Sequence, residues 1–159
     1  MAVRAVRRIV VGVDGSPDSG IALRWACREA SIRDAEVHAV HVCESPLHEP
    51  ASYAVPAPEH SYVADDTDMW KAVLPDLPPD VLVRTETAVG LVARVLLDRC
   101  EGADMLVLGS PGEVPDGIGP AGPVVRACLR RALCPVVVVS AQMVSPWGHE
   151  AMLSVPAHT

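Results

Sequence analysis

Aromatic side chains are scarce in this chain. Its 159 residues include three Trp, two Tyr and no Phe, although 50% of the residues are hydrophobic. That hydrophobic fraction excludes an intrinsically disordered chain, and the core must be built mainly from Val, Leu, Ile and Ala. The length suits one domain with a good core and no more.

Positive charge is also limited. The formal net charge is −7, which argues against non-specific nucleic-acid binding because phosphate backbones attract clustered positive charge. We interpret Arg4, Arg7 and Arg8 as a solvated basic tip. Lys71 is the only lysine and no G-x-x-x-x-G-K-[ST] motif is present, so the chain is not a P-loop ATPase.

Long hydrophobic runs are absent as well. No run approaches the length of a membrane span, and the apolar residues 9–11 are too few for a signal peptide. The cysteines form no C-x-x-C pair, and we interpret them as reduced, buried thiols of a cytoplasmic protein with no membrane partner. They are Cys27, Cys43, Cys100, Cys128 and Cys134.

Motifs for hydrolysis and for metal binding are missing. No G-x-S-x-G nucleophile elbow and no set of Ser, His and Asp suggests a hydrolase. His38 and His41 lie three residues apart in a predicted strand, so their side chains point to opposite faces and cannot share a metal ion. His48 and His60 lie in a proline-rich stretch with no visible partner. We therefore predict no catalytic residue and no metal site.

The chain is organised around a strand, a glycine-punctuated loop, a helix and a second strand. The strands of such a β-loop-α-β unit pair in parallel, and open α/β sheets bind ligands at the carboxyl ends of their strands. Glycines let a backbone approach a phosphate closely, and a helix N-terminus offers N–H groups to an anion. The four predicted segments occupy residues 105–108, 109–122, 124–132 and 136–139, respectively.

The glycine spacing of this loop resembles that of the universal stress protein family. Gly109, two residues, Gly112, nine residues and Gly122 match the spacing of the family's ATP-binding branch. In that branch the third glycine is followed by Ser or Thr, whereas here it is followed by Pro123. The resemblance is stronger for the family than for ATP binding, since some branches bind no nucleotide.

Two further motifs extend the resemblance to about residues 7–140. They are Val-Asp-Gly-Ser at 13–16 and Cys-Pro-Val-Val-Val-Val at 134–139. The resemblance implies an α/β fold: a three-layer sandwich with a five-stranded parallel sheet, Rossmann-like and of the adenine-nucleotide α-hydrolase-like type. We predict a universal stress protein domain at 1–140 and an irregular C-terminal tail at 141–159.

The remaining elements precede this unit. Prolines exclude a helix or a central strand from residues 44–64, so the long second helix that is usual in the family is expected to be short. Strands are predicted at residues 7–13, 36–42 and 81–89, and helices at about residues 17–33, 65–74 and 91–100.

The resemblance also implies nucleotide-binding roles for individual residues. Asp14 would contact the adenine or the ribose, and the alternative is that it only shapes the turn before Ser16. The backbone of Val42 would recognise adenine. The glycines would cradle the phosphates, and the alternative is a tight turn with no ligand. The implied nucleotide-binding set is Asp14, Val42, Gly109, Gly112, Gly122, Pro123 and Val124.

The loop itself is unusual for a phosphate site. Glu113 and Asp116 would repel a polyphosphate unless a divalent ion such as Mg²⁺ lay between them. Pro123 removes a hydroxyl and an N–H at the helix start, and each lost hydrogen bond to a charged group costs about 1.5–3 kcal/mol, or roughly 10- to 150-fold in affinity. Arg126, near the first turn of that helix, would compensate if it reached the phosphates, and the alternative, which we favour, is a solvated helix face. We therefore expect the phosphates to contribute less to binding than in related proteins.

The resemblance implies a cytoplasmic stress-response sensor or regulator that binds ATP or another adenine nucleotide, with no enzymatic activity beyond slow ATP hydrolysis. The alternative is a stress protein that binds no nucleotide and acts as a dimeric protein-interaction module. Related proteins pair their last strand across a two-fold axis. The strand from Val136 to Val139 is therefore expected at a sheet edge, where it would join a homodimer.

Overall fold

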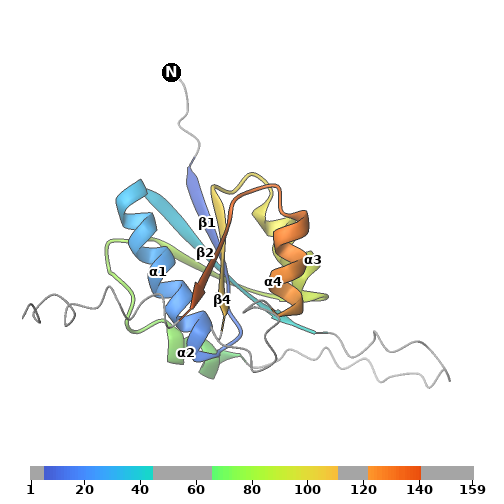
Figure 1. Ribbon diagram of the computed structural model, residues 1–159. Helices are drawn as coiled ribbons and strands as arrows, with labels where there is room; N and C mark the ends of the chain where they lie inside the picture. Colours follow the sequence, from blue (N-terminus) through green and yellow to red (C-terminus); the bar gives the residue numbers. More distant parts are fainter. Residues whose placement is uncertain (1–5, 45–65, 111–121, 141–159) are drawn as a thin grey trace, which may run out of the picture.

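The computed structural model describes residues 6–44, 66–110 and 122–140. Within these segments, strands and helices alternate along the chain (Figure 1). The strands are β1 (Arg7–Gly12), β2 (Ala35–Cys43), β3 (Val83–Val89), β4 (Met105–Ser110) and β5 (Val136–Ser140), and the helices are α1 (Pro17–Arg33), α2 (Thr67–Val73), α3 (Val92–Cys100) and α4 (Pro123–Arg131).

All five strands form one parallel sheet in the order β3-β2-β1-β4-β5. The chain winds outward from β1 in both directions, so the order reverses between β1 and β4. Helices α1 and α2 cover one face of the sheet and α3 and α4 cover the other (Figure 1). The predicted three-layer α/β architecture is therefore confirmed.

The core is aliphatic on both faces of the sheet. Ile9, Val10 and Val11 of β1 are fully buried, because this central strand is covered by helices on either side. Leu23 of α1 packs in one cluster and Leu96 of α3 in the other. The near-continuous apolar run of β1 predicted a strand that is buried on both faces, and the helices on the two faces of the sheet bury it in this way.

Helix α1 begins and ends as its sequence predicts. The Ser16 hydroxyl accepts a hydrogen bond from the Ser19 amide at 3.2 Å, and Pro17 follows at the first helical position, where its missing N–H has no consequence. Asp34 ends the helix in the left-handed conformation with φ 54°. The start of this helix is consequently a well-defined turn beside the end of β1.

Two predicted boundaries need correction. Gly109 was expected in the loop, but β4 continues through Ser110, because Gly109 and Ser110 pair with Val139 and Ser140 of β5. Helix α4 begins at Pro123 rather than at the following valine. Other ends shift by one or two residues, as helix and strand ends commonly do. Helix α2 is short, as expected.

Several predictions lie outside the described residues. These are the phosphate role of Gly112, the acidic loop residues Glu113 and Asp116, the proline-rich stretch over most of 44–64, and the tail at 141–159. The domain boundary at residue 140 likewise stays a prediction. No helix in the described segments combines the length and apolar character needed to cross a bilayer.

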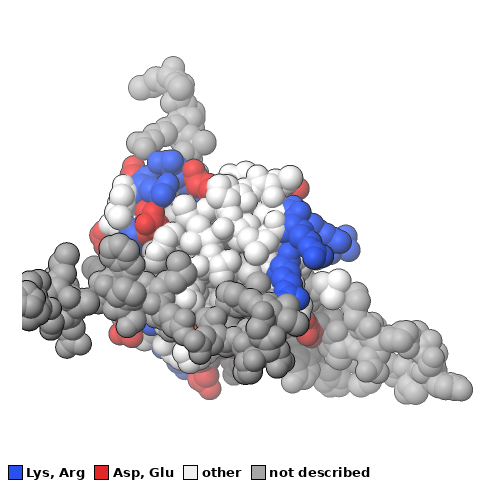
Figure 2. Space-filling model, in the orientation of Figure 1, with Lys and Arg blue, Asp and Glu red and all other residues white. Residues whose placement is uncertain are grey.

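Charge is unevenly distributed over the surface. Figure 2 shows basic side chains gathered on the side of the molecule where α3 and α4 lie, and a mixed acidic and basic group near the end of α1. The exposed arginines of α4 are Arg126, Arg130 and Arg131. Although the net charge of the chain is negative, the side of its surface where α3 and α4 lie is locally basic.

Candidate functional site

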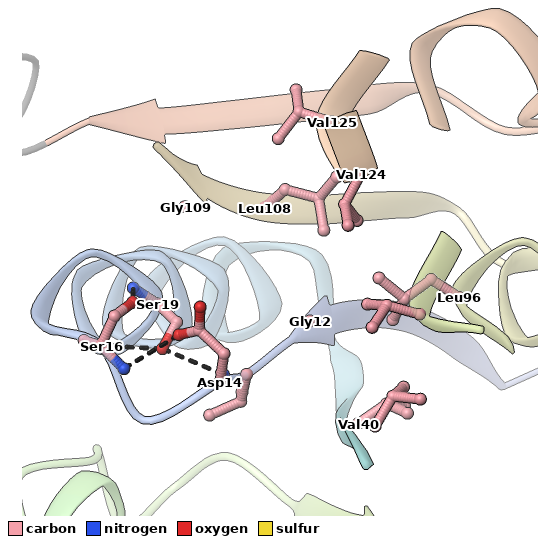
Figure 3. A pocket seen from close by; sticks show the side chains of 13 residues that line it. Gly12, Asp14, Ser16, Ser19, Val40, Leu96, Leu108, Gly109, Val124 and Val125 are labelled. Atoms are coloured by element: carbon pink, nitrogen blue, oxygen red, sulfur yellow. Dashed lines mark hydrogen bonds between the residues drawn. The ribbon is translucent and has the colours of Figure 1, made fainter. Parts of the chain in front are cut away.

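A cavity of about 210 Å³ lies at the carboxyl ends of β1 and β4. It sits where the strand order reverses, which is where open α/β sheets bind ligands. The start of α1 borders it on one side, and the first turns of α3 and α4 border it on the other (Figure 3). The sequence predicted ligand binding at the carboxyl ends of the parallel strands, and the cavity lies there.

The inner wall of the cavity is apolar. Val40, Leu96, Leu108 and Val125 provide it from two strands and two helices (Figure 3). Gly12 keeps this space open, because a Cβ atom at this position would lie 2.9 Å from Leu108 Cδ2. The wall therefore suits an apolar group more than a charged one.

Asp14 stands at the rim in a hydrogen-bonded turn. Its Oδ1 accepts from the Ser16 amide at 2.9 Å, and its own amide donates to Ser19 Oγ at 3.3 Å (Figure 3). The Ser19 hydroxyl in turn donates to the Ser16 carbonyl at 3.0 Å. Asp14 shapes this turn, and its exposed carboxylate also lines the cavity.

The charge state of Asp14 follows from the same contacts. Partial burial raises the pKa of its carboxyl, but hydrogen bonds from Ser16 and Ser19 outweigh that effect and the pKa is lowered overall. Asp14 is thus ionised at neutral pH and acts only as an acceptor. It can accept from a hydroxyl or an exocyclic amine, and it repels a phosphate.

Asp14 is also the only charged residue among the described residues that line the cavity. No lysine or arginine of the described segments reaches this space. The apolar wall and the single carboxylate fit the uncharged part of a nucleotide, the base and the sugar. A polyphosphate would find no cation there.

Close packing against α1 explains why residue 109 is a glycine. A Cβ atom at this position would lie 2.6 Å from the Asp18 carbonyl carbon and oxygen and 2.8 Å from the Ser19 amide nitrogen. Only a residue without a Cβ lets the first turn of α1 approach β4 so closely. A tight-packing role, which requires no ligand, therefore accounts for this first glycine of the motif.

Gly122 has no comparable constraint. It is the exposed N-cap of α4 with φ −62°, and an added Cβ would meet no atom within 4 Å. The described neighbours would tolerate another residue here.

The structure brings some of the sequence-predicted site residues together. Asp14, Val42, Gly109 and Val124 all line the cavity. Gly122 and Pro123 lie at the start of α4 and are not among its lining residues, while Pro123 borders an adjoining groove. Gly112 lies outside the described residues. Nucleotide contacts by this set stay predictions.

Sequence reasoning missed other lining residues. Ser19, Val92 and Leu96 all face the cavity, yet the sequence marks them only as helical positions. The hydroxyl of Ser19, three residues after the Ser16 cap, was the one available signal, because serines near a strand-to-helix turn commonly bind backbone or ligand groups.

The two histidines of β2 point to different surroundings, as predicted. His38 Nε2 lies 3.0 Å from Glu86 Oε2, whereas His41 Nδ1 lies 2.8 Å from the Val13 carbonyl oxygen and therefore donates to it. Among the described residues, no group of three or more His, Cys, Asp or Glu side chains is arranged to hold a metal ion.

Comparison with known proteins gives consistent matches. The model of the universal stress protein family matches residues 5–140. A universal stress protein of Mycolicibacterium smegmatis is 33% identical over 145 residues, covering 82% of this chain and 47% of the relative. Universal stress protein Rv2623 of Mycobacterium tuberculosis is 33% identical over 146 residues, covering 82% and 46%. The chain spans about half the length of these curated relatives.

Solved structures share the fold at low sequence identity. A universal stress protein from Archaeoglobus fulgidus in complex with dAMP aligns with a TM-score of 0.57 at 20% identity, covering 83% of this chain and 96% of that one. The Arabidopsis thaliana protein At3g01520 with AMP bound gives 0.53 at 21%, covering 84% and 91%. A universal stress protein in complex with cAMP gives 0.56 at 22%, covering 85% and 97%.

Proposed function

Since the chain belongs to the universal stress protein family, we propose that it binds an adenine nucleotide in the cavity between β1 and β4. In this proposal it acts as a cytoplasmic stress-response sensor or regulator, with ATP or another adenine nucleotide as its ligand. The observation that carries the proposal is an apolar cavity at the switch point of the sheet with the Asp14 carboxylate at its rim. No enzymatic activity beyond slow ATP hydrolysis is expected.

The chemistry of the cavity suits adenosine. The base would lie against the apolar wall near Val40 and Leu108, and Asp14 would accept a hydrogen bond from a ribose hydroxyl or from the adenine amine. Val42 lies near the end of β2 and lines the cavity, and in this proposal its backbone recognises a base edge. The AMP, dAMP and cAMP bound by structural neighbours support this assignment.

The first experiment asks whether nucleotide is present at all. The purified protein is denatured, and the released small molecules are separated and assayed for adenine nucleotides. Titration calorimetry of the nucleotide-free protein with adenosine, AMP and ATP, with and without Mg²⁺, then measures affinity. No released nucleotide together with no binding of any of the three would overturn the proposal.

Asp14 variants test the recognition of adenosine. Asp14→Asn keeps a side-chain oxygen for the Ser16 amide but removes the charge, and Asp14→Ala removes both. If the carboxylate accepts from the ligand, both variants lose affinity for adenosine, by about tenfold or more for a hydrogen bond to a charged group. Asp18→Asn, one turn away and outside the cavity lining, is the matched control and should bind like the parent. Equal affinity in all variants would leave Asp14 as a turn residue only.

A second candidate function is a dimeric interaction module without nucleotide. It is favoured by one observation, the absence of any cation among the described residues that line the cavity. A protein that remains dimeric by light scattering but binds neither adenosine nor ATP at millimolar concentration would support this alternative.

A further inference from the structure

A groove adjoins the cavity and opens between α3 and α4. Its volume is about 550 Å³, and it shares two lining residues with the cavity, Val92 at the start of α3 and Val124 at the start of α4. These two valines therefore form a common rim. A ligand that fills the cavity can continue over this rim into the groove without leaving the protein surface.

The cavity alone is small for a nucleotide. Ligand sites typically enclose roughly 300–1,000 Å³, whereas the cavity has about 210 Å³. The cavity and the groove together fall within that range. Part of a bound nucleotide must consequently lie outside the apolar cavity, and the groove is the adjoining space.

The groove carries the cations that the cavity lacks. Arg94 of α3 and Arg131 of α4 line it and are exposed, and neither is among the ion pairs found between described residues. Arg131 shares a helix face with Val124 and Ala127, because residues at i, i+3 and i+7 align along a helix. Arg94 and Arg131 belong to α3 and α4, and Figure 2 shows basic side chains gathered on the side of the molecule where these two helices lie.

We propose that the phosphates of the bound nucleotide cross the rim between Val92 and Val124 and are held in the groove by Arg94 and Arg131. The inference rests on the proposed function, since it assigns the anionic end of the same ligand. Arginine suits this role because its guanidinium binds phosphate oxygens through two parallel N–H groups. The groove thus replaces the phosphate grip that Pro123 weakens at the start of α4.

The position of the two arginines predicts a graded response. Arg94 lies in the first turn of α3, close to Val92, whereas Arg131 lies about 10 Å further along α4 than Val124 at a rise of about 1.5 Å per residue. A monophosphate is expected to reach Arg94. A triphosphate is long enough for its outer phosphates to approach Arg131.

Two carboxylates in the groove should affect phosphate binding in the opposite direction to the two arginines. Glu44 and Asp98 also line it, and they oppose the binding of phosphate. Removing the charge of Glu44, which follows the end of β2, should therefore strengthen the binding of ATP. If the groove held a cationic group of the ligand, removing this charge would weaken binding. If it held an uncharged group, the affinity would not change.

The experiment compares adenosine, AMP and ATP by titration calorimetry on the full chain and on four variants. Arg94→Gln should weaken the binding of AMP and ATP, and Arg131→Gln should weaken ATP more than AMP, each by about threefold to fivefold for an exposed charge-assisted contact. Adenosine affinity should stay within about twofold of the parent. Glu44→Gln should raise ATP affinity by about threefold. Arg130→Gln, the neighbouring exposed arginine that does not line the groove, should change nothing.

The outcomes separate this inference from the proposed function. Adenosine binding with ATP affinity unchanged in both Arg94→Gln and Arg131→Gln would overturn the groove assignment and leave the cavity assignment standing. An equal loss in Arg130→Gln would also overturn it, because the effect would then be general electrostatics. If adenosine and both nucleotides fail to bind the parent, the proposed function fails and the inference fails with it. Unchanged melting temperatures establish that each variant is folded.

Discussion

At the scale of single residues, the glycines of the loop motif divide by their surroundings. Gly109→Ala places a Cβ within 2.6 Å of the α1 backbone, so the first turn of α1 must move away from β4. We expect the free energy of unfolding to fall by about 1–3 kcal/mol or more, as for an overpacked core. Gly122→Ala meets no atom within 4 Å, and a loss below about 1 kcal/mol is expected for an N-cap glycine. Urea unfolding of both variants decides, and similar losses would contradict the packing role of Gly109.

The same scale shows which site residues the sequence can predict. Asp14 and Val42 end strands of a parallel sheet, so their place at one edge follows from the strand pattern alone. Val92 and Leu96 line the cavity only because α3 packs at a particular tilt, which its apolar periodicity does not reveal. The contact between Gly109 and the first turn of α1 joins segments far apart in sequence, and no local pattern predicts it.

At the scale of elements, helix α4 begins without a side-chain cap. Gly122 offers no side chain and Pro123 offers no N–H at the first helical position. Pro123→Ser restores an N–H and a hydroxyl beside the groove. ATP affinity should rise by about threefold or more while adenosine affinity stays unchanged, because in this proposal only the phosphates lie near the start of α4. Helix stability should change little, because Ser and Pro are both tolerated where a helix begins.

The matched control for this substitution lies in α1. Pro17 also occupies the first position of its helix and lines neither the cavity nor the groove. Pro17→Ser should therefore leave the affinities for ATP and adenosine unchanged. Titration of ATP and adenosine against both variants provides the measurement. An ATP affinity that does not rise in Pro123→Ser would mean that the phosphates lie away from the start of α4.

Element types and order could be predicted from the sequence because hydrophobic periodicity, caps and prolines agree along most of the described chain. The short α2 follows from the prolines on either side of it. The end of β4 could not be predicted, because Gly109 and Ser110 read locally as loop residues and are held in the strand only by pairing with β5. Tertiary pairing overrides local propensity at this point.

At the scale of the whole molecule, the sheet has two unlike edges. The β3 edge carries Arg84 and Glu86, which form ion pairs with Glu36 and with Arg99, respectively. The β5 edge consists of four valines followed by a serine, with no charge. Charged side chains protect an edge strand from pairing with another chain, and an apolar edge invites it. The sequence-based prediction of a homodimer through β5 therefore acquires a physical reason, and the two-fold contact itself stays a prediction.

Substitutions on the two edges test this prediction. Val138→Lys, in the middle of β5, should convert a dimer to a monomer in light scattering at tens of micromolar, because a two-fold contact brings both copies of the new charge together. Thr85→Lys adds the same charge to the exposed β3 edge and should leave the dimer intact. Thermal melting of the monomeric variant separates lost association from lost folding. A parent protein that is monomeric at this concentration would contradict the predicted homodimer itself. A dimer that survives Val138→Lys would place the contact away from β5.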